Sequence, residues 1–337
     1  MIAHAPRFLI VRLGSLGDII HAVPAAAALR ARHPGARIDW LVEPKYVPVL
    51  QLVEGLNEAI PIDPRGNIRA FVRTLRRLRR AKYDAAVDLQ GLLKSAVLTA
   101  MAGARRTIGL PREHLREPLA RMFYRDTPDP GRDPHVIRKN LMLMRPLGVQ
   151  ELRITFPLEV PRTLPADTVA ANFGTEGYVA INPGAAWPNK RWPPDRFGAV
   201  AAAVRDRVGL RSVVLWGPGE EQVASLVAAA SRGAAVPCPP TGIVDLFAIA
   251  KRARLMVSGD TGPLHIAAAV GTPVVALFGP TFAERNGPWA PGDLSISRAQ
   301  RCACHYERTC RLAQACIEDI GVEEVVSAAE SRLGAGD

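Results

Sequence analysis

The chain has 337 residues, 48% of them hydrophobic, which is enough for two domains of ordinary size, each with a buried core. No apolar run approaches the roughly eighteen residues needed to span a bilayer, and the first residues do not resemble a secretory signal. The formal net charge of +11 favours anionic partners such as nucleotides, phosphorylated lipid, anionic membrane or nucleic acid. Because the sequence shows neither a membrane span nor a secretory signal, we expect a cytoplasmic protein.

The first half of the chain alternates short apolar strands with helices, a pattern typical of a parallel α/β sheet. The expected strands are Phe8–Leu13, Ile38–Val42, Ile60–Ile62 and Ala85–Leu89. An alanine-rich helix follows the loop Gly14–Asp18, with Pro24 near its start, and further helices are expected at Ile68–Arg80, Leu92–Met101 and Val136–Pro146.

The segment Phe156–Pro165 contains three prolines and is typical of a linker, after which the alternation starts again. The expected strands are Tyr178–Asn182, Ser212–Trp216, Leu255–Ser258 and Pro273–Phe278, and the expected helices are Asp195–Val208, Glu221–Ala230, Leu246–Lys251, Pro263–Val270 and Val322–Leu333. The sequence thus predicts two Rossmann-like domains, 1–160 and 161–337, that face each other across a central cleft. Ligands would bind at the carboxyl ends of the strands, and the last helix could pack back on the first domain.

Two segments have an unusual composition. Between Arg65 and Lys82 there are eight basic residues and no acidic one, which indicates either a solvated helix face or a patch for phosphate or a membrane surface. Four cysteines, Cys302, Cys304, Cys310 and Cys316, are spaced C-x-C-x5-C-x5-C. This is not a standard zinc-ribbon spacing, so free thiols, a bound metal and a disulfide all stay open.

The loop Gly14–Asp18 connects the first strand to a helix. Its two glycines, the second of which is Gly17, allow the backbone to approach a ligand closely. Asp18 would lie near the helix N-terminus, either as a helix cap or as a general base that is ionised at neutral pH.

A second strand–turn–helix unit spans Ser258–His265 and reads SGDTGPLH. Backbone N–H groups around Thr261 and Gly262 would form an anion site at the helix N-terminus. Asp260 has the wrong charge to bind phosphate, so it would orient loop amides or sugar hydroxyls, or act as an ordinary turn residue. His265 faces the same region, where a buried core histidine is the simpler interpretation.

Three further strand ends carry polar side chains. Lys190 could neutralise a leaving diphosphate, or lie on the surface. Glu220 or Glu221 could hold ribose hydroxyls, or favour the start of a helix. The turn Asp88–Ser95, which contains Gln90 and Lys94, suits an acceptor, with an ordinary turn as the alternative.

Taken together, these motifs resemble glycosyltransferase family 9, the ADP-heptose:lipopolysaccharide heptosyltransferases. The similarity rests on IVRLGSLGDIIHAVPAAAAL, YDAAVDLQGLLKSA, REPLARMFY and VSGDTGPLHIAAAVGTPVVALFGPT, and it covers most of residues 7–285. The middle two segments look most like heptosyltransferase I, which adds the first heptose to Kdo-modified lipid A. The resemblance implies a GT-B fold, inversion at the anomeric carbon, and no cofactor or metal.

The resemblance also implies roles for individual residues. Asp18 matches the proposed catalytic base, Lys190 a donor-diphosphate contact, and Asp260, Thr261 and Gly262 the donor loop, near which His265 lies. Glu221, or less closely Glu220, matches the ribose-binding acid. Gly17, His21, Gln90, Lys94 and Arg116 belong on the acceptor side, with Lys94 and Arg116 near the acceptor's phosphates or Kdo carboxylates. The partners would be ADP-heptose, anionic Kdo-lipid A and the cytoplasmic surface of the inner membrane.

Alternatives to this interpretation differ in class. The cysteine-rich segment looks more like that of second-heptose enzymes, which leaves open a later heptose or another sugar, and a GT-B enzyme with a different nucleotide-sugar is the runner-up. A nicotinamide-dependent oxidoreductase would need G-x-G-x-x-G after a strand, and neither half contains it. A nucleic-acid-binding protein is disfavoured because no known motif accompanies the charge. The intact polar motifs also argue against a non-catalytic scaffold.

Overall fold

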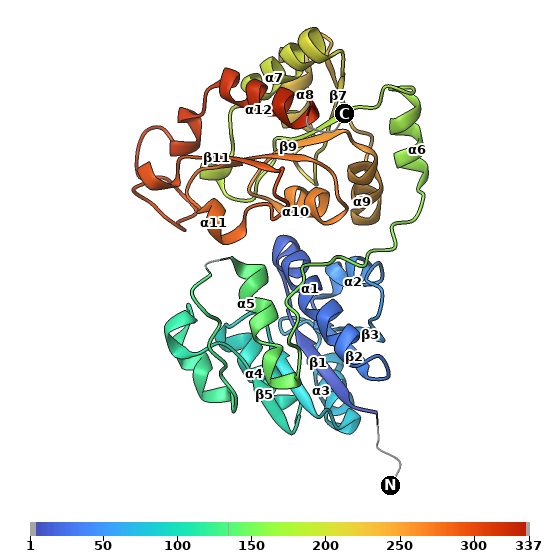
Figure 1. The fold of residues 1–337 in the computed structure, drawn as a ribbon, viewed down its shortest axis with the longest axis vertical. Helices are drawn as coiled ribbons and strands as arrows, with labels where there is room; N and C mark the ends of the chain where they lie inside the picture. Colours follow the sequence, from blue (N-terminus) through green and yellow to red (C-terminus); the bar gives the residue numbers. More distant parts are fainter. Residues whose placement is uncertain (1–4, 134, 335–337) are drawn as a thin grey trace. The chain divides into compact units, whose positions relative to one another are not determined.

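The computed structural model describes residues 5–133 and 135–334. Their contacts divide the chain into two compact units, with the division between Glu159 and Val160. Each unit is a parallel sheet with helices on its faces (Figure 1). The two units are called the first and the second domain below.

The first domain contains a five-stranded sheet in the order β3-β2-β1-β4-β5. The strands are β1 (Arg7–Val11), β2 (Arg37–Val42), β3 (Glu58–Pro61), β4 (Ala85–Asp88) and β5 (Arg106–Ile108). All neighbouring pairs are parallel, and β1 pairs with β2 on one side and β4 on the other. The chain therefore winds outward from β1 in both directions, which puts the topological switch point between β1 and β4.

The helices of the first domain are α1 (Leu16–Arg32), α2 (Val47–Leu50), α3 (Ile68–Ala81), α4 (Leu93–Met101) and α5 (Val136–Met142). Leucines of α3 and α4 pack with Leu9 and Val11 in one hydrophobic cluster. Two expectations need correction. Pro24 lies well inside α1, not near its start, and α5 ends at Met142 and is followed by a separate 3₁₀ turn, Arg145–Leu147, which contains Pro146.

The second domain contains a six-stranded sheet in the order β11-β10-β9-β6-β7-β8. The strands are β6 (Val179–Asn182), β7 (Ser212–Val214), β8 (Ala235–Pro237), β9 (Leu255–Gly259), β10 (Val274–Phe278) and β11 (Leu294–Ser297). All of these pairs are parallel, and β6 lies between β7 and β9. The winding therefore repeats that of the first domain, with β6 in the place of β1.

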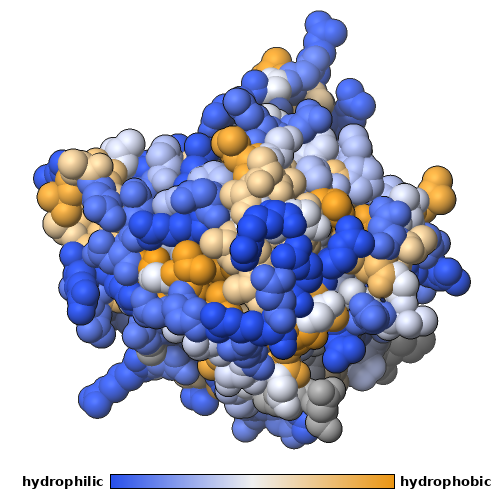
Figure 2. Space-filling view, turned by 90° about the horizontal axis from the view of Figure 1, so that it is seen from above, coloured by the Kyte–Doolittle hydropathy of each residue, from blue (hydrophilic) through white to orange (hydrophobic). Residues whose placement is uncertain are grey.

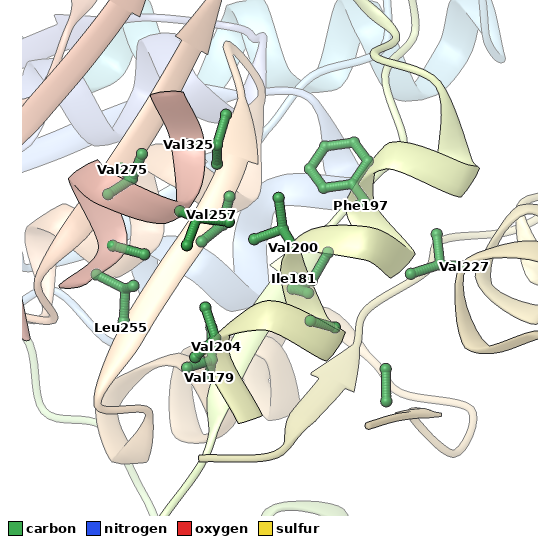
Figure 3. Packing of buried hydrophobic residues seen from close by; sticks show 14 of the residues in the cluster. Val179, Ile181, Phe197, Val200, Val204, Val227, Leu255, Val257, Val275 and Val325 are labelled. Atoms are coloured by element: carbon green, nitrogen blue, oxygen red, sulfur yellow. The ribbon is translucent and has the colours of Figure 1, made fainter. Parts of the chain in front are cut away.

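The helices of the second domain are α6 (Leu164–Ala171), α7 (Pro194–Val208), α8 (Glu221–Ala230), α9 (Ile243–Arg252), α10 (Gly262–Ala269), α11 (Ala283–Asn286) and α12 (Val322–Gly334). Helices α7, α8 and α12 lie on one side of the sheet, and α9 and α10 on the other (Figure 1). Branched aliphatic residues of β6 and β9 interlock with Phe197, Val200 and Val204 of α7 (Figure 3). Helix α12 packs on this same core through Val325.

Hydrophilic side chains cover much of the face seen in Figure 2, where hydrophobic residues gather in small groups between them. Among the described residues, no helix has both the length and the apolar character needed to cross a bilayer.

Candidate active site

The polar residues singled out in the sequence gather at the carboxyl edges of the two sheets. In the second domain they follow β6, β7 and β9, which are neighbouring strands. In the first domain they follow β1 and β4, which flank the switch point. Open α/β sheets bind ligands at this edge, because loops from adjacent strands diverge there.

Asp260 is the centre of a buried cluster in the second domain, where its side chain is 4% exposed. It accepts hydrogen bonds from Thr281 Oγ1 at 2.6 Å and Asn286 Nδ2 at 2.9 Å. Lys190 Nζ lies 2.5 Å from one carboxylate oxygen, and His265 Nε2 lies 3.3 Å from the other. Four elements of the chain thus converge on one carboxylate.

Burial alone would raise the pKa of Asp260, but its partners act more strongly in the opposite direction. Hydrogen bonding to His265 and the charge of Lys190 hold the pKa well below its usual range. The carboxylate is therefore ionised at every physiological pH. Its charge keeps the Lys190 ammonium at the strand ends, where Nζ also lies 4.7 Å from the centroid of the Trp187 ring.

The loop after β9 is tied to the end of β6 by a second set of hydrogen bonds. Asn182 Nδ2 donates to Thr261 Oγ1 at 3.0 Å and to Ser258 Oγ at 3.1 Å. Thr261 is the N-cap of α10, which begins at Gly262. The first turn of a helix has N–H groups that cannot bond within the helix, so this fixed turn can receive an anion.

The structure separates the two glutamates that the sequence left paired. Glu220 is half-buried, and one of its carboxylate oxygens accepts a hydrogen bond from Gly217 N at 3.0 Å. Its carboxylate also lies so close to Gly184 that a Cβ there would be 2.2 Å from Glu220 Oε2. Glu221 is exposed in the first turn of α8. Glu220 is thus the acid held against the β6 loop, although the sequence motif favoured Glu221.

Asp18 lies in the first turn of α1 and is paired with Arg12, a residue that the sequence analysis did not single out. Arg12 Nη2 lies 2.6 Å from Asp18 Oδ1, and the backbone N–H and hydroxyl of Ser15 approach Oδ2 at 3.2 and 3.0 Å. Asp18 therefore caps its helix and remains 37% exposed, whereas the Arg12 side chain is 8% exposed. One cation inside the apolar run FLIVRL was the signal that could have identified it.

Burial would raise the pKa of Asp18, but the charge and hydrogen bonds of Arg12, with help from Ser15, lower it below its usual value. The group is ionised at neutral pH and has one oxygen held in place by the guanidinium. Arg12 is itself fixed by a hydrogen bond from Nη1 to the Leu89 carbonyl at the end of β4. The contacts of Arg12 with Leu89 and Asp18 thus hold the Asp18 carboxylate in one orientation.

The loops after β1, β2 and β4 meet around Asp18. Gln90 Oε1 accepts a hydrogen bond from Leu13 N at 2.9 Å, and Glu43 N donates to the Leu13 carbonyl at 3.1 Å. Lys94 Nζ lies 3.5 Å from Glu43 Oε1, with 43% of the lysine side chain exposed. Lys94 is therefore accessible to an anionic ligand, whereas Gln90 braces the β1 loop.

The remaining residues predicted for the acceptor side differ in accessibility. Arg116 is exposed just after the 3₁₀ turn Arg112–His114. Gly17 is buried in the first turn of α1. His21 is only 1% exposed, and its carbonyl accepts a hydrogen bond from Asn140 of α5. His21 therefore lies inside the domain, and a direct contact between its ring and the acceptor does not fit this structure.

Asp88 is fully buried beneath the loop that carries Gln90 and Lys94. Gln90 N and Gly91 N donate to Oδ1, and Ser95 Oγ and Tyr124 OH donate to Oδ2 at 2.8 and 2.7 Å. Burial raises the pKa of this carboxyl, against the effect of those hydrogen bonds. Asp88 thus shapes the turn that carries Gln90 and Lys94, and Tyr124 joins the segment after β5 to it.

Two parallel sheets that each place polar loops at the carboxyl ends of their strands have the architecture of the GT-B class, and comparison with known proteins identifies the family. The model of glycosyltransferase family 9 (heptosyltransferase) matches residues 71–316. The chain therefore belongs to glycosyltransferase family 9, and the expected GT-B fold and transferase class are confirmed.

Relatives agree along nearly the whole chain. Lipopolysaccharide heptosyltransferase 1 of Pseudomonas aeruginosa is 31% identical over 315 residues, which cover 90% of this chain and 87% of that protein. The Escherichia coli K12 protein of the same name is 28% identical, covering 88% and 94%. Among solved structures, E. coli heptosyltransferase WaaC with ADP has a TM-score of 0.77 at 23% identity, covering 97% of this chain and 99% of that one. The likeness to WaaC supports the fold alone.

Proposed function

We propose that this enzyme transfers heptose from ADP-heptose to the Kdo-lipid A inner core of lipopolysaccharide, with inversion at the anomeric carbon. The observation that carries the proposal is the joint presence of an ionised, accessible carboxylate at Asp18 and a fixed Lys190–Asp260 donor loop. Family membership and the relatives named heptosyltransferase 1 support the donor and the type of reaction.

In this proposal the second domain binds the nucleotide-sugar. Lys190 and the first turn of α10 neutralise the diphosphate, whose charge grows as the glycosidic bond breaks. Asp260 holds Lys190 and orients the loop. Its own negative charge disfavours a direct contact with phosphate. Glu220 binds ribose hydroxyls from the adjacent strand end.

The first domain supplies the base and binds the acceptor. Asp18 takes the proton of the acceptor hydroxyl as that oxygen attacks the anomeric carbon, and ADP departs from the opposite face. A lowered pKa makes Asp18 a weak base before reaction, but the attacking hydroxyl becomes strongly acidic as the bond to carbon forms. Lys94 and Arg116, both accessible, pair with acceptor phosphates or carboxylates.

The test is a transfer assay with purified protein, ADP-heptose and Kdo-lipid A, followed by mass spectrometry of the lipid. We expect a gain of one heptose, and we expect Asp18→Asn to reduce kcat by about 10²–10⁴-fold while ADP affinity stays within a factor of two. If Asp18→Asn abolishes ADP binding, the assignment of the base fails. If ADP binds but this lipid gains no mass, the first-heptose proposal is wrong, and cores that already carry a heptose are the next acceptors to assay.

We further propose that α3 holds the enzyme on the anionic inner-membrane surface. Arg69, Arg73, Arg76 and Arg80 line a hollow of about 610 Å³ along this helix, with Ile68 and Val72 between them. Arg77 also lines this hollow, but it forms an ion pair with Glu58. We therefore do not assign Arg77 a contact with lipid. Each basic side chain near an anionic surface contributes about 1 kcal/mol of binding.

Charge reversal at Arg73 and Arg76 should therefore weaken binding to anionic vesicles by well over tenfold at low salt. A matched control reverses Arg162 and Arg232, whose side chains in the second domain are 83% and 71% exposed. Vesicle flotation measures the bound fraction. Equal loss in both variants would show that net charge, and not α3, determines the binding.

A further inference from the structure

The segment between β11 and α12 is a long loop with no hydrophobic core of its own. It spans residues 298–321 and contains only two short 3₁₀ turns, Ala299–Arg301 and Cys316–Asp319. The packed cluster in this loop consists of sulfur side chains, the buried Cys302, Cys304 and Cys316 and the half-buried Cys310. Loops of this length without regular structure are uncommon in compact domains unless something else holds them.

The four thiols form a continuous chain of contacts. Cys304 Sγ lies 3.7 Å from Cys302 Sγ and 3.3 Å from Cys310 Sγ. Cys316 is buried in the same cluster as the other three. A tetrahedral zinc ion with Zn–S bonds of about 2.3 Å has S···S edges of about 3.8 Å, close to the spacing seen here. A disulfide would use only two of the four.

A backbone hydrogen bond and several charged side chains also surround the sulfurs. Cys304 N donates to Cys302 Sγ at 3.4 Å. Between Cys302 and Cys316 the loop contains Arg308 and Arg311 and one acid, Glu307, which is paired with Arg311; Arg301 precedes Cys302, and Glu318 and Asp319 follow Cys316. A tetrathiolate shell around a divalent ion carries two negative charges, and the basic residues would offset part of this charge.

We propose that Cys302, Cys304, Cys310 and Cys316 bind one structural divalent cation, for which zinc is the best match. Among the described residues, no three His, Cys, Asp or Glu side chains surround a common cation position in this structure. The four sulfurs form an open chain. Binding closes this chain into a tetrahedron: four S–H bonds break, four metal–sulfur bonds form, and four protons pass to solvent. A closed shell of four protein ligands has no open position, so the ion takes no part in the transfer reaction.

The same loop supports the donor site. The Glu307 carbonyl accepts a hydrogen bond from Asn189 Nδ2 at 2.9 Å, and Asn189 immediately precedes Lys190. The Tyr306 N–H bonds to the Pro280 carbonyl, next to Thr281 of the Asp260 cluster. A cation that fixes the loop would therefore fix Lys190 and Thr281 from behind.

The experiment is metal analysis of the full chain by inductively coupled plasma mass spectrometry after stripping and reloading with one equivalent of zinc. We expect one zinc per chain in wild type and less than a tenth of that in Cys304→Ser. Cys238→Ser is the matched control, because Cys238 is also a buried free thiol but lies at the end of β8, outside the loop. Cobalt should give the thiolate charge-transfer and visible absorption bands of a tetrahedral site.

Absence of both zinc uptake and the cobalt spectrum in wild type would overturn the proposal. So would zinc uptake that survives Cys304→Ser, or loop peptides that are lighter by two hydrogens because a disulfide has formed. If Cys304→Ser fails to fold, Cys310→Ser replaces it, since Cys310 is the least buried of the four. The wild-type cobalt spectrum stands independently of either variant and of the transfer reaction.

Discussion

Replacing Lys190 by methionine tests the donor site most directly, because the substitution removes a charge and keeps most of the side-chain volume. The change leaves Asp260 ionised and buried without its cation. Removing one partner of a buried ion pair costs about 3–5 kcal/mol. Hydrogen bonds from Thr281, Asn286 and His265 remain, so we expect a loss at the lower end, about 3 kcal/mol.

The effect on the donor is separate from the effect on folding. A charge-assisted hydrogen bond contributes about 1.5–3 kcal/mol, so ADP should bind about ten- to a hundredfold more weakly. Calorimetric titration with ADP measures this, and urea unfolding at the same pH gives the stability. Lys251→Met provides the control, because Lys251 is an exposed lysine in the last turn of α9.

A double variant, Lys190→Met with Asp260→Asn, measures how much the two side chains stabilise each other. It removes both charges, so its loss of stability should be smaller than the sum of the single losses by about 1–3 kcal/mol. Additive losses would show that the two groups do not stabilise each other. ADP affinity of Lys190→Met within a factor of two of the Lys251→Met control would refute the role of Lys190 in donor binding.

The remaining predictions concern the other two carboxylates. Glu220→Gln should raise the KM for ADP-heptose about tenfold, as should Gly184→Ala, whose Cβ would displace the Glu220 carboxylate. Glu221→Gln should leave KM unchanged, and the reverse ranking would restore the assignment that the sequence motif favoured. Arg12→Met should raise the pKa of Asp18, because Arg12 lowers it in the wild type. The acid limb of the kcat/KM profile should then move to higher pH, and an unmoved limb would contradict Asp18 as the base.

The strands that the sequence predicted and those that it missed differ in position within the sheets. The central strands β1, β6, β9 and β10 are runs of buried aliphatic residues, which are easily recognised. The missed strands β5, β8 and β11 all lie at sheet edges. An edge strand is covered incompletely, as in the half-exposed LSIS of β11, so its hydrophobic signal is weak. The helix α6 was missed because its first turn, with Pro165, was assigned to the linker.

For the candidate site, the sequence predicted the loops better than the contacts within them. Asp18, Lys190 and Asp260 stand at strand ends in glycine-rich turns, which is a local signal. Their partners come from distant segments: Thr281 and Asn286 reach Asp260 from the loop after β10. No spacing rule connects such residues, because their proximity results from the strand order β10-β9-β6. The choice between Glu220 and Glu221 likewise depends on which side chain turns toward Gly184.

Asp18 and Asp260 illustrate how one side-chain type can serve two purposes in this enzyme. In both, paired cations and hydrogen bonds outweigh burial and keep the carboxylate ionised. Asp260 has four partners and is 4% exposed, so it has little remaining capacity to accept a proton from a ligand and acts by fixing Lys190. Asp18 is 37% exposed, and its named partners are only Arg12 and Ser15. Exposure, more than pKa, therefore distinguishes the carboxylate that can act as a base from the one that positions a cation.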